Sequence, residues 1–289
     1  MSAEKVTLNI EDTEARLLIA RRDGVERWGS MPLEPGVVSE GLMVDASRLR
    51  PVLDLIFSKH RARRNGVTVS LSGLRSVTRL ISIPRMKPSL VGSAILQESK
   101  REMPVPVETL YLLWQAIAAT EREQRFFVLG VPRELVDANV ATLRQCGIKP
   151  RSIDLKPLAL IRAINKGEAI VADLEASSFD IVVVAAGIPA ITQSMVLRQG
   201  LGLEERVGRL LDELSRTVRF YNTSNPGSPL GDSTSLYLTG RLGGESGVSE
   251  LIASRVAHKV EALPPPFKCP PSFPFAEYMV NLGLALKRS

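Results

Sequence analysis

Pairs of strand patterns occur twice in this chain, once at its N-terminus and once near residue 170, and helical patterns follow each pair. At the N-terminus Val6, Leu8 and Ile10 alternate with polar residues, which predicts a half-buried strand. In the second half, 169–174 and the uncharged run 181–197 predict buried strands, and Gly187 divides the run into a hairpin. Strands that lead into helices in both halves predict two α/β domains with a cleft between them.

The first half continues with three further strand patterns and one helix. We expect the strands at 15–20, 25–28 and 67–71, with Asp23-Gly24 as the turn before the second of these. The helix is expected at 49–56, and Pro51 requires it to begin just before that residue or to bend there.

A separate α+β pattern follows. It comprises strands at 77–83, 110–117 and 126–131, and helices at 90–95 and 135–143, the last ending at Gly147. We interpret 148–156 as a linker that leads to the apolar segment 158–164. Beyond the second hairpin we expect helices at 207–221 and 251–260, a short strand at 236–238, a proline-rich connector and a docking helix at 277–286.

Charge and composition exclude several classes of protein. The chain carries 37 Lys and Arg against 31 Asp and Glu, and its densest basic stretch, 59–64, follows the first helical pattern. Cations at that position complement the carbonyl end of a helix. Aromatic residues are only 5%, so we expect no nucleic-acid binding; binding through 59–64 is a third hypothesis, which predicts a steep salt dependence.

No segment predicts a membrane span or an export signal, and the two cysteines, Cys146 and Cys269, favour a reducing compartment. We therefore expect a cytoplasmic protein whose membrane association goes through a partner.

Common catalytic motifs are absent: the chain has no GxSxG, HExxH or GxxxxGK[ST], and Glu205 stands where a dinucleotide fingerprint beginning at Gly200 needs its third glycine. His258 is expected to be a solvated side chain on a surface helix.

Short stretches along the chain carry a family resemblance in their order and spacing. They are PLEPGVVSEG at 32–41, ISIP at 81–84, MPVP at 103–106, CGIKP at 146–150, DLKPLAL at 154–160, Phe220-Tyr221 and GLAL at 283–286. Over nearly its whole length the sequence resembles the PilM-like family of type IV pilus assembly proteins, actin-like proteins related in fold to the division protein FtsA.

The resemblance implies an actin-like two-domain α/β fold. The first half would be 1–73, completed by 151–166 and the C-terminal helix; 74–150 would be an inserted α+β subdomain, and 167–289 the second half. Between Leu197 and Glu204 the chain is several tens of residues shorter than the family pattern. We therefore expect the second subdomain of the second half, which roofs the nucleotide in actin-like proteins, to be reduced.

The resemblance also implies two phosphate loops and an adenosine-side loop, in which ATP and Mg²⁺ would bind. In the first loop Asn9 stands for an aspartate, Glu11 for a glycine and Arg16 for a lysine. In the second, Asp173, Ser177 and Ser178 are kept, but Glu175 replaces the glycine. The adenosine-side loop keeps Gly240, Gly243 and Gly244 but has Arg241 and Leu242 where the family has more glycine.

Glutamates in both phosphate loops oppose phosphate binding, because a carboxylate about 5 Å from a phosphate charge costs roughly 3 kcal/mol at an effective dielectric of 20. A Mg²⁺ ion bound between the carboxylate and the phosphate would make their interaction favourable instead. We therefore expect a vestigial nucleotide site, no catalysis and no obligatory cofactor, and a scaffold that binds the cytoplasmic tail of a PilN-like inner-membrane protein in a pilus or related secretion system. The alternative is an active Mg-ATP-binding ATPase in which Asp173 positions Mg²⁺. The formation of a homo-oligomer is left open by the sequence.

Overall fold

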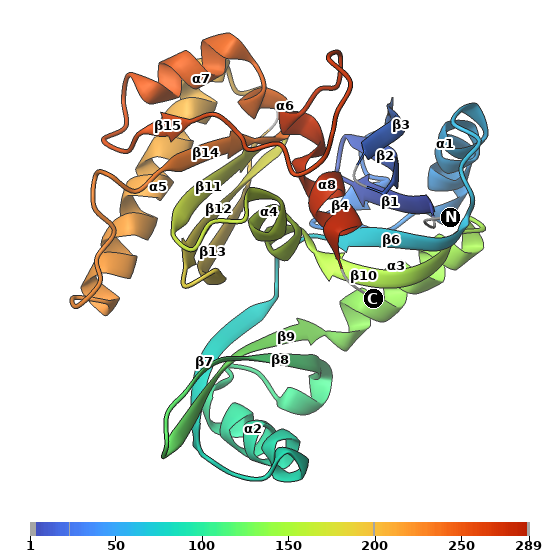
Figure 1. Ribbon diagram of the computed structural model, residues 1–289. Coiled ribbons are helices and arrows are strands. Elements are labelled where there is room, and N and C mark those ends of the chain that lie inside the picture. Colours follow the sequence, from blue (N-terminus) through green and yellow to red (C-terminus); the bar gives the residue numbers. More distant parts are fainter. Residues whose placement is uncertain (1–3, 23, 199, 288–289) are drawn as a thin grey trace. The chain divides into compact units, whose positions relative to one another are not determined.

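The computed structural model describes residues 4–22, 24–198 and 200–287, so the expected turn residue Asp23 lies outside the described residues. The chain divides into a smaller compact unit, Leu74–Ala141, and a larger unit made of the segments before and after it. The larger unit contains two five-stranded sheets and the smaller one a three-stranded sheet (Figure 1).

The first sheet of the larger unit has the strand order β10-β6-β1-β2-β3. β1, β2 and β3 form an antiparallel meander, and β6 pairs in parallel with both β1 and β10. The expected helix is α1, which begins five residues before Pro51 because the carboxylate of Asp45 caps it by accepting the N–H groups of Ser47 and Arg48. The bounds are β1 (Glu4–Ile10), β2 (Glu14–Arg21), β3 (Gly24–Pro32), β4 (Val38–Ser39), β5 (Leu42–Met43), α1 (Ala46–Lys59), β6 (Asn65–Leu71) and β10 (Lys149–Leu155).

The second sheet has the order β13-β12-β11-β14-β15, and α5 and α7 pack on one of its faces. Ala186 and Gly187 join β12 to β13, both with a positive φ, as in the tight turn of a hairpin. The bounds are β11 (Ala169–Leu174), β12 (Ser178–Ala185), β13 (Ile188–Val196), α5 (Leu203–Ser224), β14 (Leu236–Thr239), α6 (Gly240–Gly243), α7 (Ser246–Ala253) and β15 (Val260–Glu261).

Two helices, α4 (Lys156–Ile164) and α8 (Met279–Leu286), lie between the two sheets (Figure 1), and the 3-10 turn Ala276–Tyr278 precedes α8. Both helices are almost wholly buried, and one apolar cluster joins them to β2, β11 and β12. They cross at Gly283, where an added Cβ would lie 1.9 Å from the carbonyl oxygen of Ala159. The glycine is therefore required for the close approach that joins the two halves.

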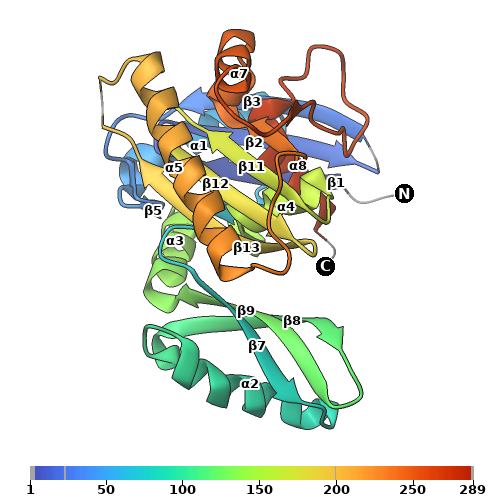
Figure 2. The same ribbon diagram turned by 90° about the vertical axis from the view of Figure 1, so that its left-hand side faces the viewer.

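The smaller unit is an antiparallel sheet of order β7-β9-β8 with α2 on one face (Figure 2). Its core contains Ile81, Phe126 and Val128 of the sheet and Ile95 of α2, all from segments where the sequence predicts a strand or a helix. The bounds are β7 (Val77–Pro84), α2 (Pro88–Glu102), the 3-10 turn Val107–Thr109, β8 (Leu110–Ala119), β9 (Glu123–Pro132) and α3 (Arg133–Gln145), whose last residues belong to the larger unit.

Two sequence-based expectations are wrong. The expected linker 148–156 contains the edge strand β10. Lys149 and Arg151 are exposed, which gives the segment the composition of a linker, but Asp154 and Leu155 of the same strand are buried. The expected helix 251–260 ends at Ala253, and Val260 belongs to β15. His258 therefore does not lie on a helix.

Only residues 197–202 separate β13 from α5, so no second subdomain stands at this point of the second half. The domain limits 1–73, 74–150 and 167–289 remain a prediction. The smaller compact unit itself ends at Ala141, because the last turn of α3 packs into the core of the first sheet through Leu143.

Candidate functional site

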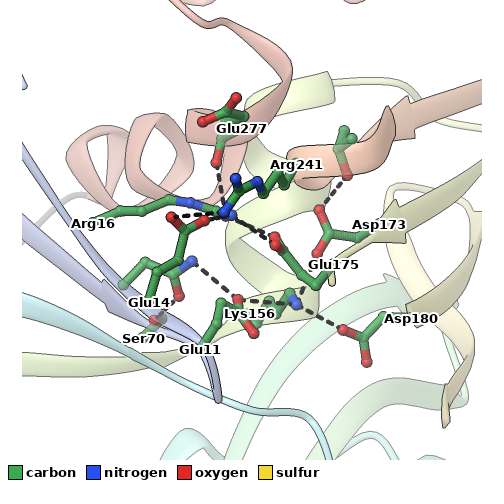
Figure 3. Close-up of polar contacts among 12 residues, drawn as sticks. Glu11, Glu14, Arg16, Ser70, Lys156, Asp173, Glu175, Asp180, Arg241 and Glu277 are labelled. Atoms are coloured by element: carbon green, nitrogen blue, oxygen red, sulfur yellow. Dashed lines mark hydrogen bonds and ion pairs between the residues drawn. The ribbon is translucent and has the colours of Figure 1, made fainter. Parts of the chain in front are cut away.

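A cluster of buried charged side chains lies inside the larger unit, where both sheets meet α4 and the start of α8 (Figure 3). Five carboxylates contribute to it: Glu11, Glu14, Asp173, Glu175 and Asp180. Two cations, Arg16 and Lys156, are buried among them, and Arg241 approaches from the exposed side. We call these eight residues the central charge cluster.

Arg16, on β2, is fully buried and connects the two halves of the larger unit. Its guanidinium donates to both carboxylate oxygens of Glu175, each at 2.6 Å, and also pairs with Glu14. It donates further to the carbonyl oxygen of Glu277, at 3.1 Å. A bidentate contact with a carboxylate fixes the planar guanidinium in both position and orientation. The side-chain amide of Asn281, on α8, donates to the backbone carbonyl oxygen of Arg16 at 3.1 Å and so attaches β2 to that helix.

Lys156 is the second buried cation and stands at the first position of α4. Its Nζ lies 2.7 Å from Asp173, 2.9 Å from Asp180 and 3.0 Å from Glu11. A cation at the N-terminus of a helix is opposed by the helix dipole, so the three carboxylates must offset both this repulsion and the cost of burial. Lys156 thereby ties the β1–β2 turn to β11 and β12.

Further hydrogen bonds fix the carboxylates that Lys156 contacts. Asn9 donates to Glu11 at 3.0 Å and accepts from the hydroxyl of Ser70, while Thr239 donates to Asp173. The hydroxyl of Ser194 donates to Asp180. Each of the three carboxylates therefore has a partner on its own half as well as Lys156.

The glycines of the expected adenosine-side loop have different surroundings. Gly240 has φ +82°, and an added Cβ would lie 2.4 Å from the carbonyl oxygen of Leu174, so this position admits only glycine without a backbone shift. Gly243 is buried against Leu238, and Gly244 is exposed. Of the two expected loop serines, Ser177 lies in the β11–β12 turn and Ser178 opens β12; both are half-buried.

The pKa values of several groups in the cluster are raised. The carboxylates around Lys156 hold its pKa well above the ordinary value, although burial acts against this. Burial raises the pKa of Asp180, and it raises that of Glu175 to about 8 although Arg16 acts in the opposite sense. The cluster holds five carboxylates but only three cations, and Glu175 and Glu14 both pair with the guanidinium of Arg16.

An actin-like fold implies a Mg²⁺ ion at this site, and three carboxylates of the cluster are the candidate ligands. Oxygen atoms of Glu11, Asp173 and Glu175 lie within 4.8 Å of one another, and carboxylate oxygens are the ligands that Mg²⁺ prefers. All three carboxylates, however, are already paired with Lys156 or Arg16. A divalent cation would have to displace Lys156, so these residues do not fit the group as they stand.

The sequence-predicted residues Asn9, Glu11, Arg16, Asp173 and Glu175 are thus brought together by the fold, and Gly240 packs beside them. Sequence reasoning missed Glu14, Lys156 and Asp180 as members of the cluster. Lys156 had a signal, because it is the one charged residue between Leu155 and Leu160 at the start of an apolar helix. Asp180, alone between Phe179 and Ile181 in a strand, had the same signal.

Comparisons with known proteins agree with this architecture. The family described as type IV pilus assembly protein PilM matches residues 19–206. A structure of a PilM-PilN type IV pilus biogenesis complex is similar, with 20% identity and a TM-score of 0.79 over 99% of this chain and 98% of that chain. A search of curated proteins found no match.

Two more distant structures share the fold. The ethanolamine utilization protein EutJ of Carboxydothermus hydrogenoformans has 13% identity and a TM-score of 0.57, over 99% of this chain and 90% of that one. The cytoplasmic domain of EpsL, an inner-membrane component of the type II secretion system of Vibrio cholerae, has 11% identity and a TM-score of 0.56, over 99% and 97%. The expected actin-like two-domain α/β fold is confirmed.

In the described part of the chain, no helix is long and apolar enough to cross a membrane. The family match covers well over half of the sequence, and the fold agrees with it over nearly the whole length. The chain belongs to the family of the type IV pilus assembly protein PilM.

Proposed function

We propose that this protein is a non-catalytic, actin-like scaffold of type IV pilus or related secretion assembly, in which the central charge cluster replaces Mg·ATP. The observation that carries the proposal is the Lys156 ammonium, 2.7 Å from Asp173, the aspartate that would organise Mg²⁺. A side chain of the protein therefore supplies the positive charge that a metal would bring.

Arg16 supports the same interpretation at the second phosphate loop. Its bidentate contact with Glu175 crosses between the halves where a bound phosphate would bridge the two loops of an actin-like protein. Glu175 is buried and occupies the Arg16 guanidinium, so a phosphate there would have to displace the Glu175 side chain from a closed position. The two halves are thus held together by internal ion pairs in place of a ligand.

The scaffold role follows from the family. The similar PilM structure is a complex with PilN, and the similar EpsL domain belongs to an inner-membrane component of a secretion system. We infer that this chain binds the short cytoplasmic tail of a PilN-like inner-membrane protein and so lies in the cytoplasm, peripheral to that membrane. Extended peptide tails bind to sheet edges and apolar pockets, which a rigid two-half protein holds in fixed positions.

Calorimetry with Mg·ATP tests the nucleotide part. We expect no heat of binding for the wild-type protein and no ATP hydrolysis. Micromolar binding that Asp173→Ala abolishes would establish the alternative, an active Mg-ATP-binding ATPase, for which the oxygen cluster of Glu11, Asp173 and Glu175 is the favouring observation. An Arg216→Ala variant, altered at an exposed residue of α5, is the matched control for effects of substitution alone.

Fluorescence anisotropy with a labelled N-terminal tail peptide of a PilN-like inner-membrane protein from the same organism tests the partner part. We expect saturable binding that a scrambled peptide of the same composition does not reproduce. Binding should be the same with and without Mg·ATP, because the scaffold needs no nucleotide. If no tail peptide binds, the partner proposal is wrong whatever the calorimetry gives.

A further inference from the structure

The smaller unit has an unprotected sheet edge. β8 lies at the edge of the order β7-β9-β8, and among the described residues it pairs with β9 alone. Its ten residues, LYLLWQAIAA, include no charged residue and no proline. Edge strands usually carry one of these, because an uncharged edge pairs readily with another strand. The opposite edge, β7, carries both, as Arg79 and Pro84.

Large apolar side chains of β8 are exposed on both faces of the sheet. Leu113 is 56% exposed and Trp114, which points to the opposite face, is 46% exposed. The indole lies against α2 at Gly92, where an added Cβ would be 3.5 Å from the ring. A register shift between Ala116 and Ala118 interrupts the strand, so the regular stretch runs from Leu110 to Ala116 and has Leu113 at its centre.

We propose that β8 pairs antiparallel with β8 of a second copy of this chain, around a two-fold axis that passes beside Leu113. A partner strand with charged residues would bring unpaired charge against Leu113 and Trp114, whereas a second β8 brings none. Antiparallel pairing of a strand with itself closes as a symmetric dimer. The axis falls at Leu113 because that residue is both the centre of the regular stretch and its most exposed large apolar side chain.

This register sets the cross-strand neighbours. Leu113 opposes Leu113 of the partner subunit on the open face, and Trp114 opposes Leu112 of the partner subunit on the α2 face. Aromatic and aliphatic pairs of this kind stabilise sheets. Seven residues from each chain make a small interface, well under the roughly 1,600 Å² of a standard one, so the dimer is expected to be weak and to form with rising concentration. The inference goes beyond the proposed function and does not depend on it.

Disulfide trapping tests the register in the full chain, with Cys269→Ser as background so that the buried Cys146 is the only remaining natural thiol. Leu113→Cys places two thiols directly opposite each other, within the Cα separation that a disulfide needs. Gln115→Cys is the matched control, because its two copies would lie about 14 Å apart along the strands. We expect a dimer on oxidation with Leu113→Cys only. Equal or greater trapping with Gln115→Cys would overturn the proposed register.

Sedimentation velocity tests the association itself. The wild-type protein should shift from monomer to dimer as its concentration rises. Leu113→Lys should raise the dissociation constant at least tenfold, because it puts two ammonium groups together at the axis, while Leu90→Lys, at an equally exposed leucine of α2, should leave it unchanged. A protein that stays monomeric at all concentrations would contradict the proposal and would leave this edge to an extended segment of another protein. An equal effect of both substitutions would also overturn it.

Discussion

Lys156 shows how a single side chain can define a site in this fold. It is buried at a helix N-terminus among three carboxylates, each within 3.0 Å of its Nζ. Burial opposes its charge, which is favoured by these three carboxylates and also by Glu175. Its role is therefore tied to the acidic residues, and its loss would leave them buried and unpaired.

Replacement of Lys156 by methionine keeps the length of the side chain and removes the charge. We expect the free energy of unfolding to fall by about 3–5 kcal/mol, because breaking a buried pair leaves uncompensated charge. Urea denaturation measures this loss. The control is Lys259→Met, at an exposed lysine paired with Glu261, for which we expect a change within about 0.5 kcal/mol. Equal effects of the two substitutions would contradict the assigned role.

Glu175 predicts a pH dependence of stability. Its pKa is raised to about 8 in the folded protein, mainly by burial, against an ordinary value of 4.5. The folded state then takes up a proton that the unfolded state does not bind, so the free energy of unfolding should rise as the pH falls from about 8 to 6.5, by up to about 1.4 kcal/mol per pH unit. Below about 6.5 His60, whose pKa is lowered by burial and nearby cations, acts in the opposite sense.

Urea denaturation of wild-type protein and Glu175→Gln at both pH values checks this dependence. The glutamine variant lacks the titrating group, so its stability should change much less over the same range. A wild-type stability that is flat or falls as the pH is lowered from 8 to 6.5 would show that Glu175 stays ionised beside Arg16.

At the scale of elements, the contact between the adenosine-side loop and β11 depends on Gly240. Its positive φ and the 2.4 Å that would separate a Cβ from the Leu174 carbonyl oxygen give two independent reasons for glycine. The resemblance alone would assign this glycine to nucleotide binding. The packing explains it without a nucleotide.

Gly240→Ala should therefore lower the free energy of unfolding by more than a positive φ alone would explain. The control is Gly187→Ala, at a turn with φ +73° and no atom within 4 Å of an added Cβ, for which we expect about 1–2 kcal/mol. We expect Gly240→Ala to exceed this by at least about 1 kcal/mol, since neighbouring backbone must move. Urea denaturation of both variants measures the difference, and equal losses would mean that the contact with Leu174 relaxes freely.

Most elements could be predicted from the sequence, because their apolar residues have a clear period. The alternating strands at 6–10 and 67–71 and the helix at 207–221 are examples. β10 could not be predicted, since an edge strand with Pro150 and exposed basic residues has the composition of a linker. The end of α7 was also missed, because the apolar residues up to Val260 continue into a strand.

At the scale of the whole molecule, the two cysteines report on different parts of the larger unit. Cys146 is fully buried in the core of the first half, and burial raises its pKa to about 11. Cys269 is half-buried in the connector before α8, and burial raises its pKa as well. Because the thiolate is the reactive form, both thiols should react more slowly than an ordinary cysteine, and Cys146 more slowly than Cys269.

Labelling with a thiol reagent at pH 8 should thus give two phases. The faster one should disappear in Cys269→Ser and the slower one in Cys146→Ala. Addition of urea below the unfolding midpoint should accelerate mainly the slower phase, because Cys146 becomes accessible only when the core opens. A single phase, or a faster reaction of Cys146, would mean that the core of the first half opens more readily than its packing indicates.

The sequence by itself determined the two-half α/β organisation, the inserted α+β pattern, the short connection after β13 and the glutamates in both phosphate loops, because periodicity, spacing and residue identity are local properties. Only the tertiary structure decided what those glutamates do. Arg16 and Glu175 are far apart in sequence, as are Lys156 and Glu11, and their pairing depends on how two sheets close around α4 and α8. Ion pairs between distant segments have no sequence period, so the presence of cations at the centre of an acidic cluster could be established only in three dimensions.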